Sequence, residues 1–185
     1  MSHRRRDKEE LDVLRGPVPS HGIIIADGGK RPQHVLQAVA SARATGCEVA
    51  VLPTGSCTGA AEAWQRAQDY ALSIGWAWWM PLGDDDLVMP TWGKAFALAH
   101  AEGKLTDDVW RVTCSSMYLI DANGVPYGVV ETPPMGFHRT SAVSDLGGYL
   151  AKADDDGSRS DVYLCERASA RNLVNRVAEA VWYCY

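Results

Sequence analysis

Short apolar runs and amphipathic stretches alternate along the first hundred residues of the chain. Each of three runs rich in β-branched or aromatic residues ends in a turn that contains glycine, which predicts a buried strand followed by a loop. The stretches between them place apolar residues three and four positions apart, as amphipathic helices do. The strands are expected within residues 22–30, 47–56 and 76–83, and the helices within residues 31–46, 58–75 and 91–103.

The pattern changes in the second half. Residues 109–132 resemble a hairpin whose turn lies at residues 122–124, and residues 141–151 and 161–174 have helical patterns. Strands that alternate with helices predict an α/β fold. We therefore expect a single Rossmann-like domain over residues 22–185, with a mostly parallel central sheet flanked by helices and an antiparallel hairpin after the acidic run at residues 84–86. Residues 1–21 are expected to form a flexible or docking arm.

Composition narrows the class of protein. A length of 185 residues suits one domain, and the net charge of −5 gives no general attraction to nucleic acid or acidic membranes. The five cysteines form no CxxC pair, which is typical of reduced thiols in a cytosol-like compartment. No apolar stretch is long enough to span a bilayer. The sequence thus predicts a soluble cytoplasmic protein, and it allows a homo-oligomer.

The segment WWMPLGDDDLVMP, residues 78–90, holds the strongest chemical signal. Asp84, Asp85 and Asp86 follow a buried strand, at the edge of the sheet where α/β proteins bind ligands. Adjacent carboxylates repel one another, and a divalent ion that also binds substrate phosphates removes this repulsion. The segment therefore predicts a Mg²⁺ or Mn²⁺ site that carries a diphosphate. The alternative is a solvated loop that caps the next helix.

A second acidic triplet lies at residues 154–156, within ADDDGSRSD. It lacks the closing glutamate of a calcium-binding loop, so we interpret it as an exposed loop.

Four segments in order resemble the GT-A-fold glycosyltransferases of the family 2 group. LGDDDLVMP is similar to the acidic motif of that family, and GKRPQHVLQAVASA is similar to its first loop and helix, with Lys30 in place of an asparagine. GFHRTSAVSDLGGY resembles the segment that leads into its Gly-Gly-aromatic turn. SDVYLCERA is similar to its Glu-Asp-x-x-Leu-x-x-Arg element, with Ser160 in place of the glutamate. The resemblance covers about residues 22 to 175.

The resemblance implies roles for individual residues. Asp161 corresponds to the aspartate that is the usual catalytic base, although a helix N-cap is a compatible role. Asp86 is expected to contact the metal directly, and Asp84 or Asp85 is expected to contact the metal or the ribose. His138, next to Arg139, is a candidate further ligand of the metal or the diphosphate, and an ordinary core histidine is the alternative.

The correspondence of the first two strands to those of the family leaves two choices for the nucleotide contact. We prefer residues 23–29 as the first strand and residues 48–56 as the second, because the first strand is central in the fold and its loss would leave neighbouring backbone groups unpaired. Thr54 then stands where a base-contacting aspartate is expected. In the other choice, Asp27 contacts the base. Arg31 is a further candidate for nucleotide binding in the loop before the first helix.

The implied activity is a metal-dependent, inverting transfer of a sugar from a nucleoside-diphosphate sugar to an acceptor hydroxyl. The sequence leaves the acceptor open among a glycan, a lipid, a protein and a modified nucleobase, with a lipid less favoured. Two alternatives remain: an enzyme like the sugar-1-phosphate nucleotidyltransferases, and a non-catalytic module for nucleotide-sugar binding or assembly. The first is suggested by the glycines and Arg31 of IIIADGGKRP, and the second by the short region after Asp161.

Overall fold

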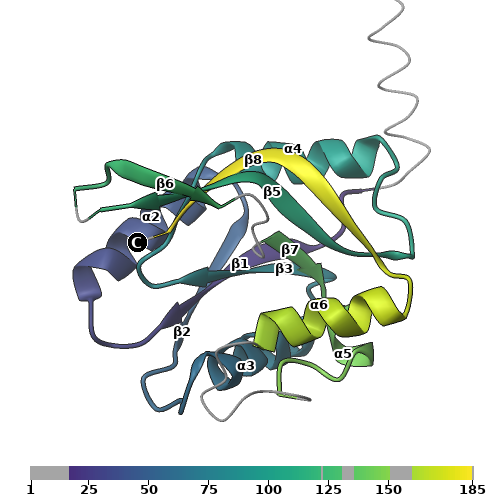
Figure 1. The fold of residues 1–185 in the computed structure, drawn as a ribbon, viewed down its shortest axis with the longest axis horizontal. Helices are drawn as coiled ribbons and strands as arrows, with labels where there is room; N and C mark the ends of the chain where they lie inside the picture. Colours follow the sequence, from purple (N-terminus) through teal and green to yellow (C-terminus); the bar gives the residue numbers. More distant parts are fainter. Residues whose placement is uncertain (1–16, 122, 131–135, 151–159, 185) are drawn as a thin grey trace, which may run out of the picture.

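The computed structural model describes residues 17–121, 123–130, 136–150 and 160–184, which form one curved sheet with helices on both faces (Figure 1). Helices α2 (Pro32–Ala44) and α4 (Thr91–Ala101) cover one face, and α3 (Ala60–Ser73), α5 (Thr140–Asp145) and α6 (Ser160–Ala170) cover the other. The predicted α/β class is confirmed. None of the helices in these ranges is long and apolar enough to cross a membrane. Most of the predicted arm (residues 1–16) and the predicted loop at residues 154–156 lie outside the described residues.

The first half of the chain forms the parallel part of the sheet. Strands β2 (Glu48–Pro53), β1 (His21–Asp27) and β3 (Trp78–Gly83) lie side by side in this order. The side chains of Ile23–Ile25 are fully buried, because helices cover both faces of β1. Asp27 lies opposite Pro53, and Ala26 lies opposite Gly83. The turns after the three strands therefore meet at one edge of the sheet.

The second half of the sheet is mixed, so the prediction of a mostly parallel sheet is wrong there. Its strands are β4 (Leu87–Val88), β5 (Val109–Ile120), β6 (Pro126–Val130), β7 (Gly136–Arg139) and β8 (Val174–Cys184). β7 lies between β3 and β5 and is antiparallel to both. β8 is parallel to β5, β6 is antiparallel to β5, and β4 is antiparallel to β8. With only four residues, β7 is too short for an alternating pattern to reveal it in the sequence.

The C-terminal strand β8 was also not predicted. The segment at 161–174, which we expected to be helical, ends its helix at Ala170, and the chain then returns as a long strand beside β5 (Figure 1). The aromatic end of the chain, residues 181–184, pairs with β4 through Leu87 opposite Tyr183. These residues therefore lie in the sheet, next to the segment that follows the three aspartates.

Two hydrophobic clusters fill the space between the sheet and its helices. The tryptophans of residues 76–79 are buried in them, as predicted from their positions. Trp92, at the start of α4, is fully buried between this helix and the sheet, and only 3% of Trp110 is exposed. Both tryptophans thus contribute to packing, and neither presents a face on which a sugar ring could stack.

Candidate functional site

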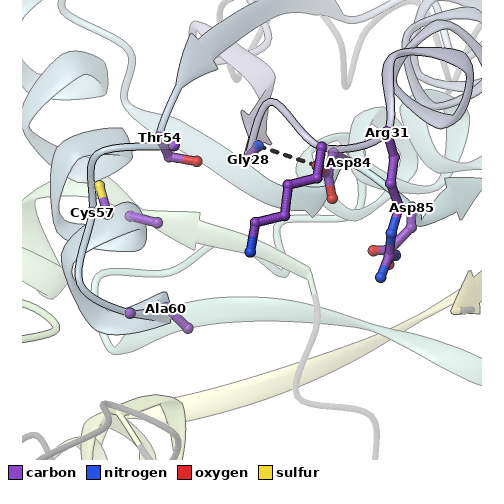
Figure 2. A pocket seen from close by; sticks show the side chains of 11 residues that line it. Gly28, Arg31, Thr54, Cys57, Ala60, Asp84 and Asp85 are labelled. Carbon is purple, nitrogen blue, oxygen red and sulfur yellow. Dashed lines mark hydrogen bonds and ion pairs between the residues drawn. The ribbon is translucent and has the colours of Figure 1, made fainter.

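A cavity of about 290 Å³ lies where the turns after β1, β2 and β3 meet the first turn of α3 (Figure 2). It is lined by Gly28, Lys30, Arg31, Thr54, Gly55, Cys57, Gly59, Ala60, Ala63, Asp84 and Asp85. The cavity therefore lies at the carboxyl ends of parallel strands, the usual position of a ligand site in an open α/β sheet.

Close contacts between the turns form the floor of the cavity. The backbone N–H of Gly28 donates a hydrogen bond to Asp84 Oδ2 at 3.1 Å, and the N–H of Thr54 donates one to the carbonyl of Asp27 at 2.7 Å. A Cβ atom on Gly28 would lie 3.3 Å from Asp84 Oδ2, and one on Gly55 would lie 3.0 Å from the Gly28 carbonyl oxygen. The glycines thus allow the turns after β1 and β2 to approach each other and the acidic turn.

The three aspartates of the acidic turn point in different directions. Asp84 and Asp85 are half-buried and line the cavity, whereas Asp86 is only 5% exposed and does not line it. Asp86 Oδ2 accepts a hydrogen bond from the N–H of Gly83 at 3.3 Å, which closes the turn. The residue expected to contact a metal most directly therefore faces the protein.

Asp86 also contacts the C-terminal strand. Leu87 lies opposite Tyr183 in the antiparallel β4–β8 pair, so the residue opposite Asp86 is Cys184. Burial, together with the charge and hydrogen bond of Asp86, raises the pKa of the Cys184 thiol to about 12. The thiol is therefore protonated at neutral pH and can donate to the carboxylate. β8 thus supports the acidic turn from behind.

Opposite charges meet within the cavity. Arg31, in the loop before α2, forms an ion pair with Asp85, and Figure 2 shows the two side chains side by side. The Arg31 side chain is 53% exposed and that of Asp85 is 28% exposed, so water reaches both groups. Lys30, which is exposed, lines the same cavity. The wall thus combines two carboxylates with two cations.

The two predicted base-contacting residues differ in position. Thr54 is 7% exposed and lines the cavity across from Arg31 (Figure 2). Asp27 does not line it, because its Oδ1 accepts a hydrogen bond from the N–H of Gly29 at 2.7 Å and so stabilises the turn after β1.

His138 is not close to the acidic turn. It lies on β7 opposite Trp79, and the five residues from Trp79 to Asp84 correspond to roughly 16 Å along a strand. Its imidazole is 4% exposed, and its Nδ1 is 2.8 Å from the hydroxyl of Tyr149. Burial and the nearby charge of Arg111 hold the pKa of His138 well below its usual value of 6.5. In this structure it is a neutral core histidine.

Asp161 lies in the first turn of α6, away from the lining of the cavity. It is half-buried, and its charge raises the pKa values of Tyr149 and Cys165, although burial is the largest cause of both shifts. Asp161 is therefore close to these two side chains, on the face of the sheet that α6 covers.

The residues present fit a divalent ion whose coordination a diphosphate completes. Within the described part of the chain, no three His, Cys, Asp or Glu side chains are placed to hold a metal by themselves. Mg²⁺, however, is commonly bound by one or two carboxylates, with water and substrate phosphates as its other ligands. Asp84 and Asp85 supply such a pair of carboxylates at the cavity wall.

One wall of the cavity was missed by the sequence analysis. Gly59, Ala60 and Ala63 belong to the start of α3, and Cys57 belongs to the loop before it. The N-cap residue Gly59 has no side chain that could accept a hydrogen bond from the first N–H groups of α3. Such a helix start carries partial positive charge and favours an anion. The available signal was a glycine followed by small residues directly after the second strand.

The strand order, the two-sided helical cover and the cavity at the strand ends define a GT-A-like α/β domain. The chain is similar to the crystal structure of residues 1–349 of TarS from S. aureus, a GT-A-type glycosyltransferase, with a TM-score of 0.59 and 13% sequence identity. The similarity covers 89% of this chain but only 60% of the TarS chain. A comparison with sequence models of protein families finds no match, and neither does one with curated protein sequences.

Proposed function

We propose that this protein is a metal-dependent glycosyltransferase that moves a sugar from a nucleoside-diphosphate sugar to an acceptor hydroxyl, with inversion at the anomeric carbon. The observation that carries the proposal is the pairing of Asp84 and Asp85 with Lys30 and Arg31 in one cavity at the carboxyl edge of the sheet. The similarity of the fold to TarS, a glycosyltransferase, supports the class of reaction.

In this proposal the cavity binds the diphosphate of the donor. Asp84 and Asp85 would hold Mg²⁺ or Mn²⁺, and the bound ion would neutralise the negative charge that grows on the leaving diphosphate. Lys30 and Arg31 bind the oxygens of the diphosphate. Arg31 must leave Asp85 for the phosphate, an exchange that costs little because both partners of the ion pair are in contact with water.

The opposite wall receives the nucleoside. Ala60 and Ala63 have small side chains, so the start of α3 leaves space between itself and Arg31. The hydroxyl of Thr54 can both donate and accept a hydrogen bond, and it replaces the carboxylate that the family resemblance led us to expect there. We expect the ribose or base to lie against this wall.

Asp161 takes the role of the general base. A carboxylate is sufficient for this role, because the acceptor hydroxyl becomes acidic only as the new glycosidic bond forms. For inversion, the acceptor attacks the face of the sugar opposite the diphosphate, so the base and the cavity must lie on different sides of the sugar. The acceptor is a hydroxyl of a glycan, protein or modified nucleobase.

The class of the structural neighbour favours a glycosyltransferase over a nucleotidyltransferase. A non-catalytic module for nucleotide-sugar binding would use the same cavity and would not need Asp161. The two functions therefore differ in turnover and not in binding of the donor.

The proposal is tested by thermal unfolding with Mn²⁺ and a panel of nucleoside diphosphates, each alone and together. A ligand at a hundred times its Kd adds about 2.7 kcal/mol to the free energy of unfolding, which corresponds to a shift in Tm of roughly 5–10 °C for a domain of this size. We expect this shift when both components are present. Asp84→Asn and Asp85→Asn should abolish it, because each removes a carboxylate from the cavity wall.

Two variants serve as controls. Asp86→Asn should lower the Tm of the free protein but keep the ligand shift, because Asp86 supports the turn from outside the cavity. Asp69→Asn, on the exposed face of α3, should change neither value. If no nucleoside diphosphate shifts the Tm with or without Mn²⁺, the proposed function is wrong. A shift without release of nucleoside diphosphate from any sugar nucleotide would favour the binding module.

A further inference from the structure

A buried arginine lies beneath α6, outside the cavity. Arg111 is only 7% exposed, and it stands next to a β-bulge where the register between β5 and β8 shifts after Val109. The bulge turns Trp110 and Arg111 toward the same side, and the guanidinium carbon of Arg111 lies 4.7 Å from the centre of the Trp110 ring. A feature of this kind directs a side chain to a position that a regular strand would not allow.

Helix α6 covers this side of the sheet. Its inner face contributes Leu164 and Cys165 to the hydrophobic cluster that also contains Trp110 and Tyr149. Residues four positions apart lie on the same face of a helix, so Asp161 shares this face with Cys165. The first turn of α6 therefore directs its carboxylate toward the region of the sheet where Arg111 is buried.

Arg111 and Asp161 act on the same neighbours. Arg111 forms a hydrogen bond with Cys165, and its charge lowers the pKa values of Cys165 and Tyr149. The charge of Asp161 raises both. The positive charge of Arg111 and the negative charge of Asp161 are therefore both close to Cys165 and Tyr149. A guanidinium this deeply buried requires a nearby negative charge or several hydrogen bonds, and Asn175 Oδ1 supplies one acceptor at 3.4 Å from Arg111 Nε.

We propose that Arg111 is a positioning residue for Asp161: the bulge on β5 holds its guanidinium so that the Asp161 carboxylate keeps one orientation at the start of α6. This inference rests on the proposed function, in which Asp161 accepts the acceptor proton. A base must stay within hydrogen-bonding reach of that proton, and a carboxylate that a fixed cation holds loses the rotamers that would take it elsewhere.

A double-mutant cycle tests the contact itself. The equilibrium constant for unfolding in urea is measured for the wild type, Arg111→Met, Asp161→Asn and the double variant. The effects of substitutions at interacting residues are not additive. We therefore expect the fold-change that Arg111→Met causes in the equilibrium constant for unfolding to be on the order of tenfold smaller when Asp161 is already replaced. Arg176→Met, an exposed arginine on β8, is the matched control and should be additive with Asp161→Asn. Additive effects of Arg111 and Asp161 would overturn the proposal whether or not the protein turns over a sugar nucleotide.

Turnover separates positioning from simple support of the fold. Release of nucleoside diphosphate is measured with UDP-glucose, GDP-mannose, ADP-glucose and dTDP-glucose. Arg111→Met should lower kcat on the order of tenfold with an unchanged KM for the donor, and Arg111→Lys should restore part of the loss. In the Asp161→Asn background, Arg111→Met should cause no further loss of kcat. An equal loss in both backgrounds would contradict the positioning role.

The outcomes also separate this inference from the proposed function. If the wild type shows no Tm shift with Mn²⁺ and nucleoside diphosphates, the proposed function fails, while the unfolding cycle still reports whether Arg111 and Asp161 interact. If the wild type binds and turns over a donor but the two residues are additive, only the inference fails.

Discussion

The cavity at the strand ends and the polar cluster beneath α6, formed by Arg111, His138 and Tyr149, each contain an arginine, but in opposite environments. In the cavity, Arg31 and Asp85 form an ion pair that water reaches. Beneath α6, the side chains of Arg111, His138 and Tyr149 are each less than a tenth exposed. An arginine therefore serves a different purpose in each region: accessible partners can be exchanged for a ligand, whereas buried partners fix a geometry.

The energies differ for the same reason. An exposed ion pair contributes about 0–1 kcal/mol, because water competes for both charges. A buried polar group that loses its partner costs about 1–3 kcal/mol, because no water replaces the lost bond. Substitutions in the cavity should therefore change binding and leave stability nearly unchanged, whereas substitutions beneath α6 should change stability first.

The largest effect on stability is expected for Tyr149→Phe. Its hydroxyl forms the hydrogen bond with His138 Nδ1, and His138 Nε2 has no hydrogen-bond partner among the described residues. The substitution leaves the buried imidazole without either bond and should lower the free energy of unfolding by about 1–3 kcal/mol. Urea unfolding measures this loss. Tyr127→Phe, on the exposed side of β6, should stay within about 0.5 kcal/mol of the wild type. If both variants lowered the free energy of unfolding equally, burial of the hydroxyl would not explain the loss.

The second largest effect expected on stability is a dependence of the free energy of unfolding on pH. Burial, and then the charge of Arg111, hold the pKa of His138 below 6.5, so below this pH the unfolded chain binds a proton that the folded protein excludes. Stability should therefore fall as the pH decreases from about 7 to about 5, by up to about 1.4 kcal/mol per pH unit. His138→Phe should reduce this slope, and Arg31→Ala should retain it. A slope that is the same in wild type and His138→Phe would show that His138 does not cause it.

Periodicity in the sequence predicted most of the fold. The strand–helix alternation located β1, β2 and β3 and the helices between them, since these elements are long enough to show a pattern. It failed for β4 and β7, which have two and four residues, and for β8. β8 shows no regular alternation of apolar and polar residues, because Asn175 and Arg176 are both polar and residues 180–184 are all apolar. It also begins only a few residues after a helix, so no change of pattern marks its start.

The candidate site was predicted less completely than the fold. The sequence indicated that Asp84 and Asp85 follow a buried strand, and the structure places both at the cavity. It could not indicate that Asp86 turns inward, because that direction depends on β8, nearly a hundred residues later. His138 was grouped with the metal ligands by residue type alone. Only the pairing of β7 with β3 shows which end of the sheet it occupies.

The smallest expected effect concerns the exchange of partners in the cavity. Arg31 competes with a metal ion for Asp85, so Arg31→Ala should strengthen the binding of Mn²⁺ alone by a few-fold, consistent with the energy of an exposed ion pair of about 0–1 kcal/mol. The same variant should weaken the binding of a nucleoside diphosphate, because it removes a cation from the cavity in which we propose that the diphosphate binds. Isothermal titration with each component measures both changes. Arg43→Ala, which removes an exposed charge from the last turn of the same helix region, should affect neither. Partner exchange predicts that Arg31→Ala binds Mn²⁺ more tightly and the nucleoside diphosphate more weakly. If removing any positive charge were the cause, Arg31→Ala and Arg43→Ala would strengthen the binding of Mn²⁺ equally.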